Sequence, residues 1–170
     1  MKRWIGLFLT LTVAVGCLLG GCAADNHADR LPITQDFSCH ATITYHDLSL
    51  QGDLCCSAAD GLQMTFSEPK SLQNITIGWN GNDVSMKLAG MTVALNADSV
   101  PQGALLACLL AVLNAAPTDR QTADEGLLLT GTVQDCAYVA VFDPETGLIR
   151  SISVPEQSVE AVFTDVKRID

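Results

Sequence analysis

The segment Gln102–Ala115 reads QGALLACLLAVLNA and carries no charged side chain. On a helical wheel its large residues fall on one side and its small residues on the other, so every face needs a covering. Such a helix is about 21 Å long, which is short of the roughly 30 Å hydrocarbon thickness of a bilayer. Ser99, Pro101 and Gln102 supply an N-cap, a first-turn proline and a capping-box residue, and Pro117 follows the end. We therefore expect a helix that is enclosed by protein.

Apolar and polar residues alternate on both sides of this segment, which is the pattern of half-buried β-strands. Six strands are predicted before the helix, at residues 37–46, 48–56, 62–66, 72–79, 83–88 and 91–95. A polar loop is predicted at 116–126, followed by four strands at 127–133, 136–142, 148–154 and 158–166. Turn signals separate neighbouring strands, among them Asn80-Gly81, Ala89-Gly90 and Asp143–Gly147. The predicted fold is mainly β with one central α-helix (α+β), an antiparallel incomplete β-barrel wrapped around the apolar helix.

The predicted strand Cys136–Phe142 is apolar at every position. Loss of the apolar–polar alternation is typical of a strand that is covered on both faces. We therefore predict that this strand is central, with the helix on one side and other protein on the second.

The N-terminus has the layout of a secretory signal, with Lys2 and Arg3 followed by an apolar run. The run Leu19-Gly20-Gly21-Cys22 resembles the lipobox of bacterial lipoproteins. That resemblance implies cleavage before Cys22 and a diacylglyceryl group on its thiol, which anchors the chain to the extracytoplasmic face of the cell membrane. The alternative is a plain signal peptide that is cleaved near Ala24. Three regions are thus predicted: a lipoprotein signal peptide at 1–21, an anchor and flexible tether at 22–35, and one folded domain at 36–170.

Charge and length limit the possible partners of the mature chain. Removal of residues 1–21 leaves 149 of the 170 residues, which is enough for one domain with a core. Lys2 and Arg3 leave with the signal, so 7 basic side chains oppose 19 acidic ones, a net charge of −12. This sign opposes binding to nucleic acid or to an anionic lipid surface.

Two loose motifs carry a resemblance to a known family. The first is Phe66-Ser67-Glu68-Pro69, followed by Leu72, Ile75, Ile77, Trp79 and Asn80-Gly81; the second is Phe142–Leu148. With the predicted strands and helix, the chain resembles the lipoprotein carrier superfamily of LolA and LolB from about residue 37 to 166. It is also similar to uncharacterised anchored lipoproteins of Gram-positive bacteria with that fold. The resemblance implies that the concave sheet face holds acyl chains or other apolar ligands, and that the helix acts as a plug or lid.

The folded domain contains five of the seven cysteines: Cys39, Cys55, Cys56, Cys108 and Cys136. If the first hairpin closes at Asp47-Leu48, Cys39 faces Cys56 and His40 faces Cys55. An exported compartment permits a Cys39–Cys56 disulfide. The other interpretation is that four of these cysteines are small buried apolar residues, and the sequence leaves the disulfide state open.

Sites for chemistry are not evident in the sequence. Adjacent strand cysteines point to opposite faces, and no Cys-x-x-Cys or His-x-x-x-His spacing occurs, so no metal site or cofactor is predicted. No nucleophile elbow or phosphate loop occurs, and His40 and His46 lie on a polar strand face. The prediction is a protein that is not an enzyme.

An apolar cavity is the remaining candidate site. We predict that it is lined from the sheet and from the helix, by Met64, Trp79, Met86, Leu105, Leu109 and Leu113. The predicted function is non-enzymatic binding of a lipid or other hydrophobic small molecule. The alternative is a cell-envelope protein-interaction module, in which the same residues fill the core and no ligand is bound.

Overall fold

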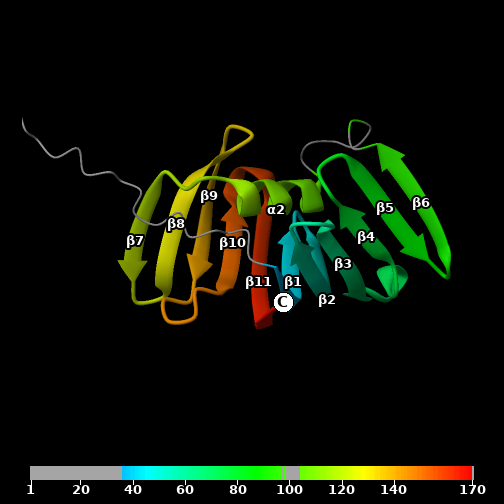
Figure 1. Ribbon diagram of the computed structural model, residues 1–170, viewed down its shortest axis with the longest axis horizontal. Coiled ribbons are helices and arrows are strands. Elements are labelled where there is room, and N and C mark those ends of the chain that lie inside the picture. The colour runs from blue at the N-terminus through cyan, green and yellow to red at the C-terminus, as the bar shows by residue number, and fades with distance from the viewer. Residues whose placement is uncertain (1–35, 97, 99–103, 170) are drawn as a thin grey trace, which may run out of the picture. The chain divides into compact units, whose positions relative to one another are not determined.

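A computed structural model describes residues 36–96, 98 and 104–169 (Figure 1). These residues form one antiparallel sheet of eleven strands in the order β6-β5-β4-β3-β2-β1-β11-β10-β9-β8-β7. The strands are β1 Phe37–Tyr45, β2 Leu48–Ser57, β3 Gly61–Glu68, β4 Thr76–Trp79, β5 Asp83–Leu88, β6 Met91–Asn96, β7 Asp119–Ala123, β8 Gly126–Val133, β9 Cys136–Phe142, β10 Ile149–Val154 and β11 Val159–Arg168. Since β6 and β7 end the sheet without pairing with each other, the sheet is open. The predicted incomplete barrel around a helix is confirmed.

Helix α2, Leu105–Asn114, packs against one face of this sheet, which we call the inner face (Figure 1). It contacts β3 and β4 in one half of the sheet and β8 in the other. Within α2 only Ala111 is partly exposed and only Asn114 is exposed, so the enclosure expected from the sequence is present. No helix in the described residues is both long enough and apolar enough to cross a membrane.

The helix begins later than predicted. Ala104, in extended conformation, precedes its first turn and provides no side-chain cap. The predicted capping residues Ser99, Pro101 and Gln102 lie outside the described residues. Eight of the ten helical residues are buried. Burial of each large apolar side chain stabilises the folded state by about 1.5–3 kcal/mol, so tertiary packing rather than capping holds α2 in place.

Alternation places the core on the inner face. Strand β1 shows the rule, because Phe37, Cys39, Ala41 and Ile43 are buried while the residues between them are half-buried or exposed. The buried apolar residues of sheet and helix form one cluster, and no polar or charged residue is buried in the described part of the chain. The opposite side of the sheet, the outer face, is therefore the polar one.

Three predictions about the course of the strands also differ from the structure. The segment 116–126 was expected to be a loop but contains β7, an edge strand that pairs with β8. The strand expected at 72–79 begins only at Thr76, because Lys70–Leu72 forms a 3-10 turn, here η1, and Asn74 has φ of 65°. Strand β9 is not central; it lies third from the β7 edge and alternates in burial, with Val139 and Val141 half-buried on the outer face.

Candidate functional site

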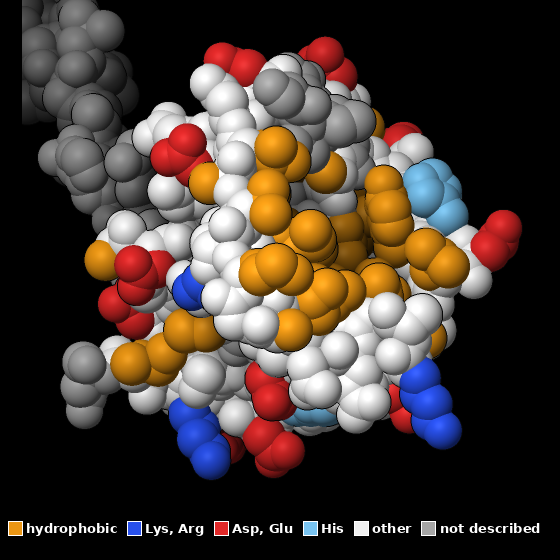
Figure 2. Space-filling model, turned by 90° about the vertical axis from the view of Figure 1, so that its right-hand side faces the viewer, with side chains coloured by type: hydrophobic (Ala, Val, Ile, Leu, Met, Phe, Trp, Pro, Cys, Tyr) orange, Lys and Arg blue, Asp and Glu red, His pale blue; other side chains and the backbone are white. Residues whose placement is uncertain are grey.

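The inner face continues beyond α2 onto β5 and β6, where nothing in the described chain covers it. Cross-strand pairs Met86–Val93, Leu88–Met91 and Val84–Leu95 all point to this face. Exposure of the side chains rises from 41% at Met86 and Leu88 to 48% at Val93, 53% at Leu95 and 66% at Met91. We call Met86, Leu88, Met91, Val93 and Leu95 the open patch. Figure 2, which views the molecule from the β6 side of Figure 1, shows hydrophobic side chains gathered in a hollow.

The open patch joins the core without interruption. Met86 lies opposite Ile77 on β4, and Ile77 lies opposite Met64 on β3. Met64 is fully buried, Ile77 is half-buried and Met86 is exposed, so one row of side chains runs from the core to solvent. No charged side chain occupies an inner-face position of β5 or β6. An apolar surface of this kind marks a place for an apolar ligand or partner.

The predicted cavity residues divide into two groups. Met64, Leu109 and Leu113 are 0%, 1% and 3% exposed and belong to the core cluster. Trp79 and Leu105, each 9% exposed, lie at the margin of the same cluster. Met86 alone of the six lies on the open patch. The sequence prediction did not include Leu88, Val93 and Leu95 as site residues, although the sequence shows apolar residues alternating with polar ones along this hairpin.

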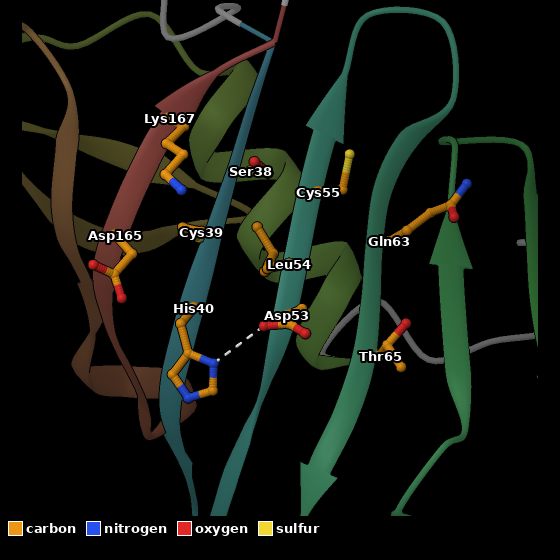
Figure 3. A pocket seen from close by; sticks show the side chains of 10 residues that line it. All are labelled: Ser38, Cys39, His40, Asp53, Leu54, Cys55, Gln63, Thr65, Asp165 and Lys167. Atoms are coloured by element: carbon orange, nitrogen blue, oxygen red, sulfur yellow. Dashed lines mark hydrogen bonds and ion pairs between the residues drawn. The ribbon is translucent and has the colours of Figure 1, made fainter.

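A second hollow, of about 470 Å³, lies on the outer face over β1, β2, β3 and β11 (Figure 3). Its lining is mostly polar and includes Ser38, Gln63, Thr65, Asp165 and Lys167. His40 Nδ1 and Asp53 Oδ1 are 3.2 Å apart across the β1–β2 pair. Since 39% of the His40 side chain and 87% of the Asp53 side chain are exposed, this surface offers solvated polar contacts rather than an enclosed reaction site.

The first hairpin has a different register from the predicted one. Tyr45 pairs with Leu48 around a His46-Asp47 turn, so Cys39 lies opposite Leu54, and Phe37 lies opposite Cys56. The expected facing pairs Cys39–Cys56 and His40–Cys55 are therefore wrong. All five described cysteines are free thiols; Cys39, Cys56 and Cys108 are buried, Cys136 is half-buried and Cys55 is exposed.

Burial controls the ionisation of these thiols. It raises the pKa of Cys39 to about 12, with smaller contributions from nearby Cys56, Asp53 and Cys55. It raises the pKa of Cys56 and of Cys108 to about 11. Thiols with such pKa values are not nucleophiles near neutral pH. In the described part of the chain, no three His, Cys, Asp or Glu side chains are grouped so that they could hold a metal ion.

The predicted lipid attachment site, Cys22, lies outside the described residues, as do the whole signal peptide at 1–21 and the whole tether at 22–35. Their assignment rests on the sequence.

No protein-family model and no curated protein matches the sequence. The structure is similar to an uncharacterized conserved protein from Thermus thermophilus, with 10% identity, 81% of this chain and 80% of that chain covered, and a TM-score of 0.49. It is similar to a DUF1329 family protein from Desulfovibrio piger, with 8% identity, 79% and 86% coverage, and a TM-score of 0.45. It is also similar to a LolA superfamily protein from Nitrosomonas europaea, with 11% identity, 81% and 87% coverage, and a TM-score of 0.43.

Proposed function

We propose that this chain is a lipoprotein, anchored through Cys22 at the extracytoplasmic face of the cell membrane, that binds a lipid or other apolar molecule without chemical change. The observation that carries the proposal is the open patch, where five apolar side chains between 41% and 66% exposed continue the core into solvent. Burial of such a surface is favourable by about 25 cal/mol per Å², so a ligand with an acyl chain gains free energy by covering it. The sequence resemblance to LolA and LolB points to the same class of ligand.

The geometry favours a ligand on the open patch over one deep beneath the helix. Met64, Leu109 and Leu113 belong to one packed cluster and have almost no exposure, so insertion of an acyl chain there would require α2 to move away from the sheet. A chain laid along β5 and β6 would displace no side chain of the described residues. Its inner end would meet Trp79, which is 9% exposed at the margin of the core.

Trp79 makes this proposal testable by fluorescence. The chain has two tryptophans, and the other, Trp4, lies in the predicted signal peptide, so Trp79 is the only tryptophan of the predicted mature chain. We expect a short-chain phospholipid with brominated acyl chains, kept below its micelle concentration, to quench Trp79 emission saturably. Unbrominated lipid should compete. The same titration with Met86→Ser plus Val93→Ser should lose the quenching.

The matched control is Lys87→Ser plus Thr92→Ser, on the same two strands but on the outer face. This variant should bind as the wild type does. If brominated lipid quenches Trp79 emission equally in both double variants, or does not quench it in the wild type, the open patch is not a lipid site.

The interaction module is the second candidate function, and one observation favours it. Five of the six predicted cavity residues are filled core positions, which leaves no internal chamber among them. In this case the open patch would contact a cell-envelope protein, the chain would purify without lipid, and Trp79 would not respond to the brominated lipid.

A further inference from the structure

The two edges of the sheet differ in how they are protected. Strand β7 reads DRQTA, with Asp119 and Arg120 at its start, and the Asp119 carboxylate accepts hydrogen bonds from the Arg120 backbone N–H and the Gln121 side chain. Strand β6 reads MTVALN, carries no charge, and is exposed at all six positions. Charged edges resist pairing with another strand, whereas an uncharged, regular edge accepts one. The β6 edge is therefore the one open to a partner.

The hairpin turn decides which backbone groups β6 presents. Ala89 and Gly90, with φ of 50° and 82°, form a two-residue turn that closes on the Leu88–Met91 pair. Hydrogen-bonded and non-hydrogen-bonded pairs alternate along an antiparallel ladder. The backbone groups of Met91, Val93 and Leu95 are thus directed at β5. Those of Thr92, Ala94 and Asn96 are directed at the open edge.

We propose that β6 pairs antiparallel with the β6 strand of a second copy of this chain, with Val93 opposite Val93 and Met91 opposite Leu95 across a two-fold axis. In this register Thr92 and Ala94 of the two copies exchange the free backbone hydrogen bonds. Val93 occupies the non-hydrogen-bonded position on the axis, where Cα atoms are about 4.5 Å apart. The inference rests on the edge and its turn, and does not require that a ligand is bound.

Side-chain chemistry favours a second copy as the occupant. Directly opposed residues in an antiparallel pair share a face, so this register joins the open patches of both copies into one apolar surface. On the outer face, Lys87 and Thr92 of one copy adjoin Ala94 and Ser85 of the other, so like charges are not opposed. No pair of opposed residues in the proposed β6–β6 pairing therefore brings two side chains of like charge together.

Head-to-tail pairing of β6 with β7 of another copy is disfavoured. Arg120 pairs with Leu129, which is buried on the inner face, so Arg120 also belongs to the inner-face side of β7. That pairing would set the charged Arg120 beside Val93 and Leu95. The two-fold arrangement avoids this, and it closes after two copies instead of growing into a filament.

Disulfide trapping in the full-length chain tests the register. Cys55→Ser removes the exposed thiol of the described domain, and Val93→Cys is added to it. Copper phenanthroline oxidation of membranes that contain this variant should give a dimer on a non-reducing gel. Leu95→Cys in the same background is the matched control, because its two thiols would lie about 13 Å apart along the strands, beyond disulfide reach. Adding Met91→Cys to Leu95→Cys should restore the dimer.

A second measurement does not depend on introduced thiols. The detergent-solubilised full-length chain should sediment as a dimer, and Ala94→Pro should sediment as a monomer that keeps the circular dichroism spectrum of the folded wild type. Proline removes an N–H that points to the open edge, so the ladder with β5 is kept. Three results would overturn the proposal: a folded Val93→Cys variant without a dimer, equal trapping of Leu95→Cys alone, or a wild-type monomer. Trp79 quenching by brominated lipid, measured on the wild type and on Ala94→Pro, whose substituted residue lies on the outer face, reports separately on the proposed function.

Discussion

Gly131 on β8 lies directly opposite Tyr138 on β9, and the Tyr138 ring covers the glycine so closely that a methyl group there would be 2.7 Å from the ring carbon Cε1. The ring thus fills the inner face in the half of the sheet that is far from the open patch. Tyr138 is 1% exposed, and its hydroxyl has no hydrogen-bond partner. The apolar bulk of the ring, and not its polar end, is what this half of the core uses.

Substitutions at this pair should therefore change stability by different amounts. Gly131→Ala should lower the free energy of unfolding by about 1–3 kcal/mol, because a methyl group is forced against the buried Tyr138 ring. Tyr138→Phe should change it by less than about 1 kcal/mol in either direction, because no hydrogen bond is lost. Urea unfolding of both variants measures the two values. A large loss in Tyr138→Phe would mean that the hydroxyl has a partner after all.

The thiols should react in the order of their burial. At pH 8 iodoacetamide should label Cys55 of the described cysteines first. Cys39, Cys56 and Cys108, with pKa values raised by burial to about 12, 11 and 11, should be labelled only after unfolding in urea. Mass spectrometry of the peptides reads out each site. Labelling of native Cys39 at the rate of Cys55 would contradict the burial of Cys39 on the inner face.

The sequence predicted those helices and strands that bury an apolar face. The helix and ten of the strands carry one apolar face or are apolar throughout, and this periodicity located them. Strand β7 has no such face, since all five residues are exposed and backbone pairing with β8 alone defines it. The first hairpin was assigned to the correct faces but displaced by two residues, because a shift of two preserves the side-chain alternation.

The site was predictable in part for the same reason. Apolar periodicity identifies the inner face but does not tell which of its residues another part of the chain will cover. Leu109 and Met86 are both apolar residues in periodic segments. Leu109, on α2, is buried against the inner face, whereas Met86, on β5, is not covered by the ten-residue helix and is exposed. Only the strand order, which puts β5 and β6 outside the span of α2, separates core from open patch.

Asp143 should make stability depend on pH in the acid range. Its carboxylate accepts the backbone N–H groups of Thr146 at 2.8 Å and Glu145 at 3.0 Å, and it pairs with Arg150. Chiefly through the Thr146 N–H, these groups lower the pKa of Asp143 from 3.8 to about 2. A lowered folded-state pKa gives a stabilisation that is complete above pH 3.8 and is lost as the pH falls through about 2.

The corresponding variant is Asp143→Asn, which keeps an oxygen acceptor in the turn and removes the charge. Its unfolding temperature should be below that of the wild type at pH 7, and the two should converge between pH 4 and pH 2. Circular dichroism melting at steps of pH measures the difference. A gap that stays constant down to pH 2 would show that the charge has no part in the turn.

The proposed anchor predicts a change in location. Cys22→Ala should prevent diacylglyceryl transfer, so the chain should be released from the membrane or stay unprocessed with its signal attached. Fractionation and mass measurement of the N-terminus distinguish these forms. Cys17→Ala, which changes the other cysteine of that region, is the control and should leave the chain in the membrane. A fully processed Cys22→Ala chain that stays on the membrane would refute the anchor.

The core and the open patch can finally be separated in one experiment, thermal unfolding with and without a short-chain phospholipid. Leu109→Ala removes a side chain that is 1% exposed and should lower the free energy of unfolding by about 2–5 kcal/mol. Met91→Ser, at a position that is 66% exposed, should lower it by less than about 0.5 kcal/mol. A ligand that binds only the folded state raises stability by RT ln(1 + [L]/Kd), whatever the stability without it. The lipid-induced rise should therefore persist in Leu109→Ala and shrink in Met91→Ser; the reverse pattern would place the ligand under the helix instead of on β5 and β6.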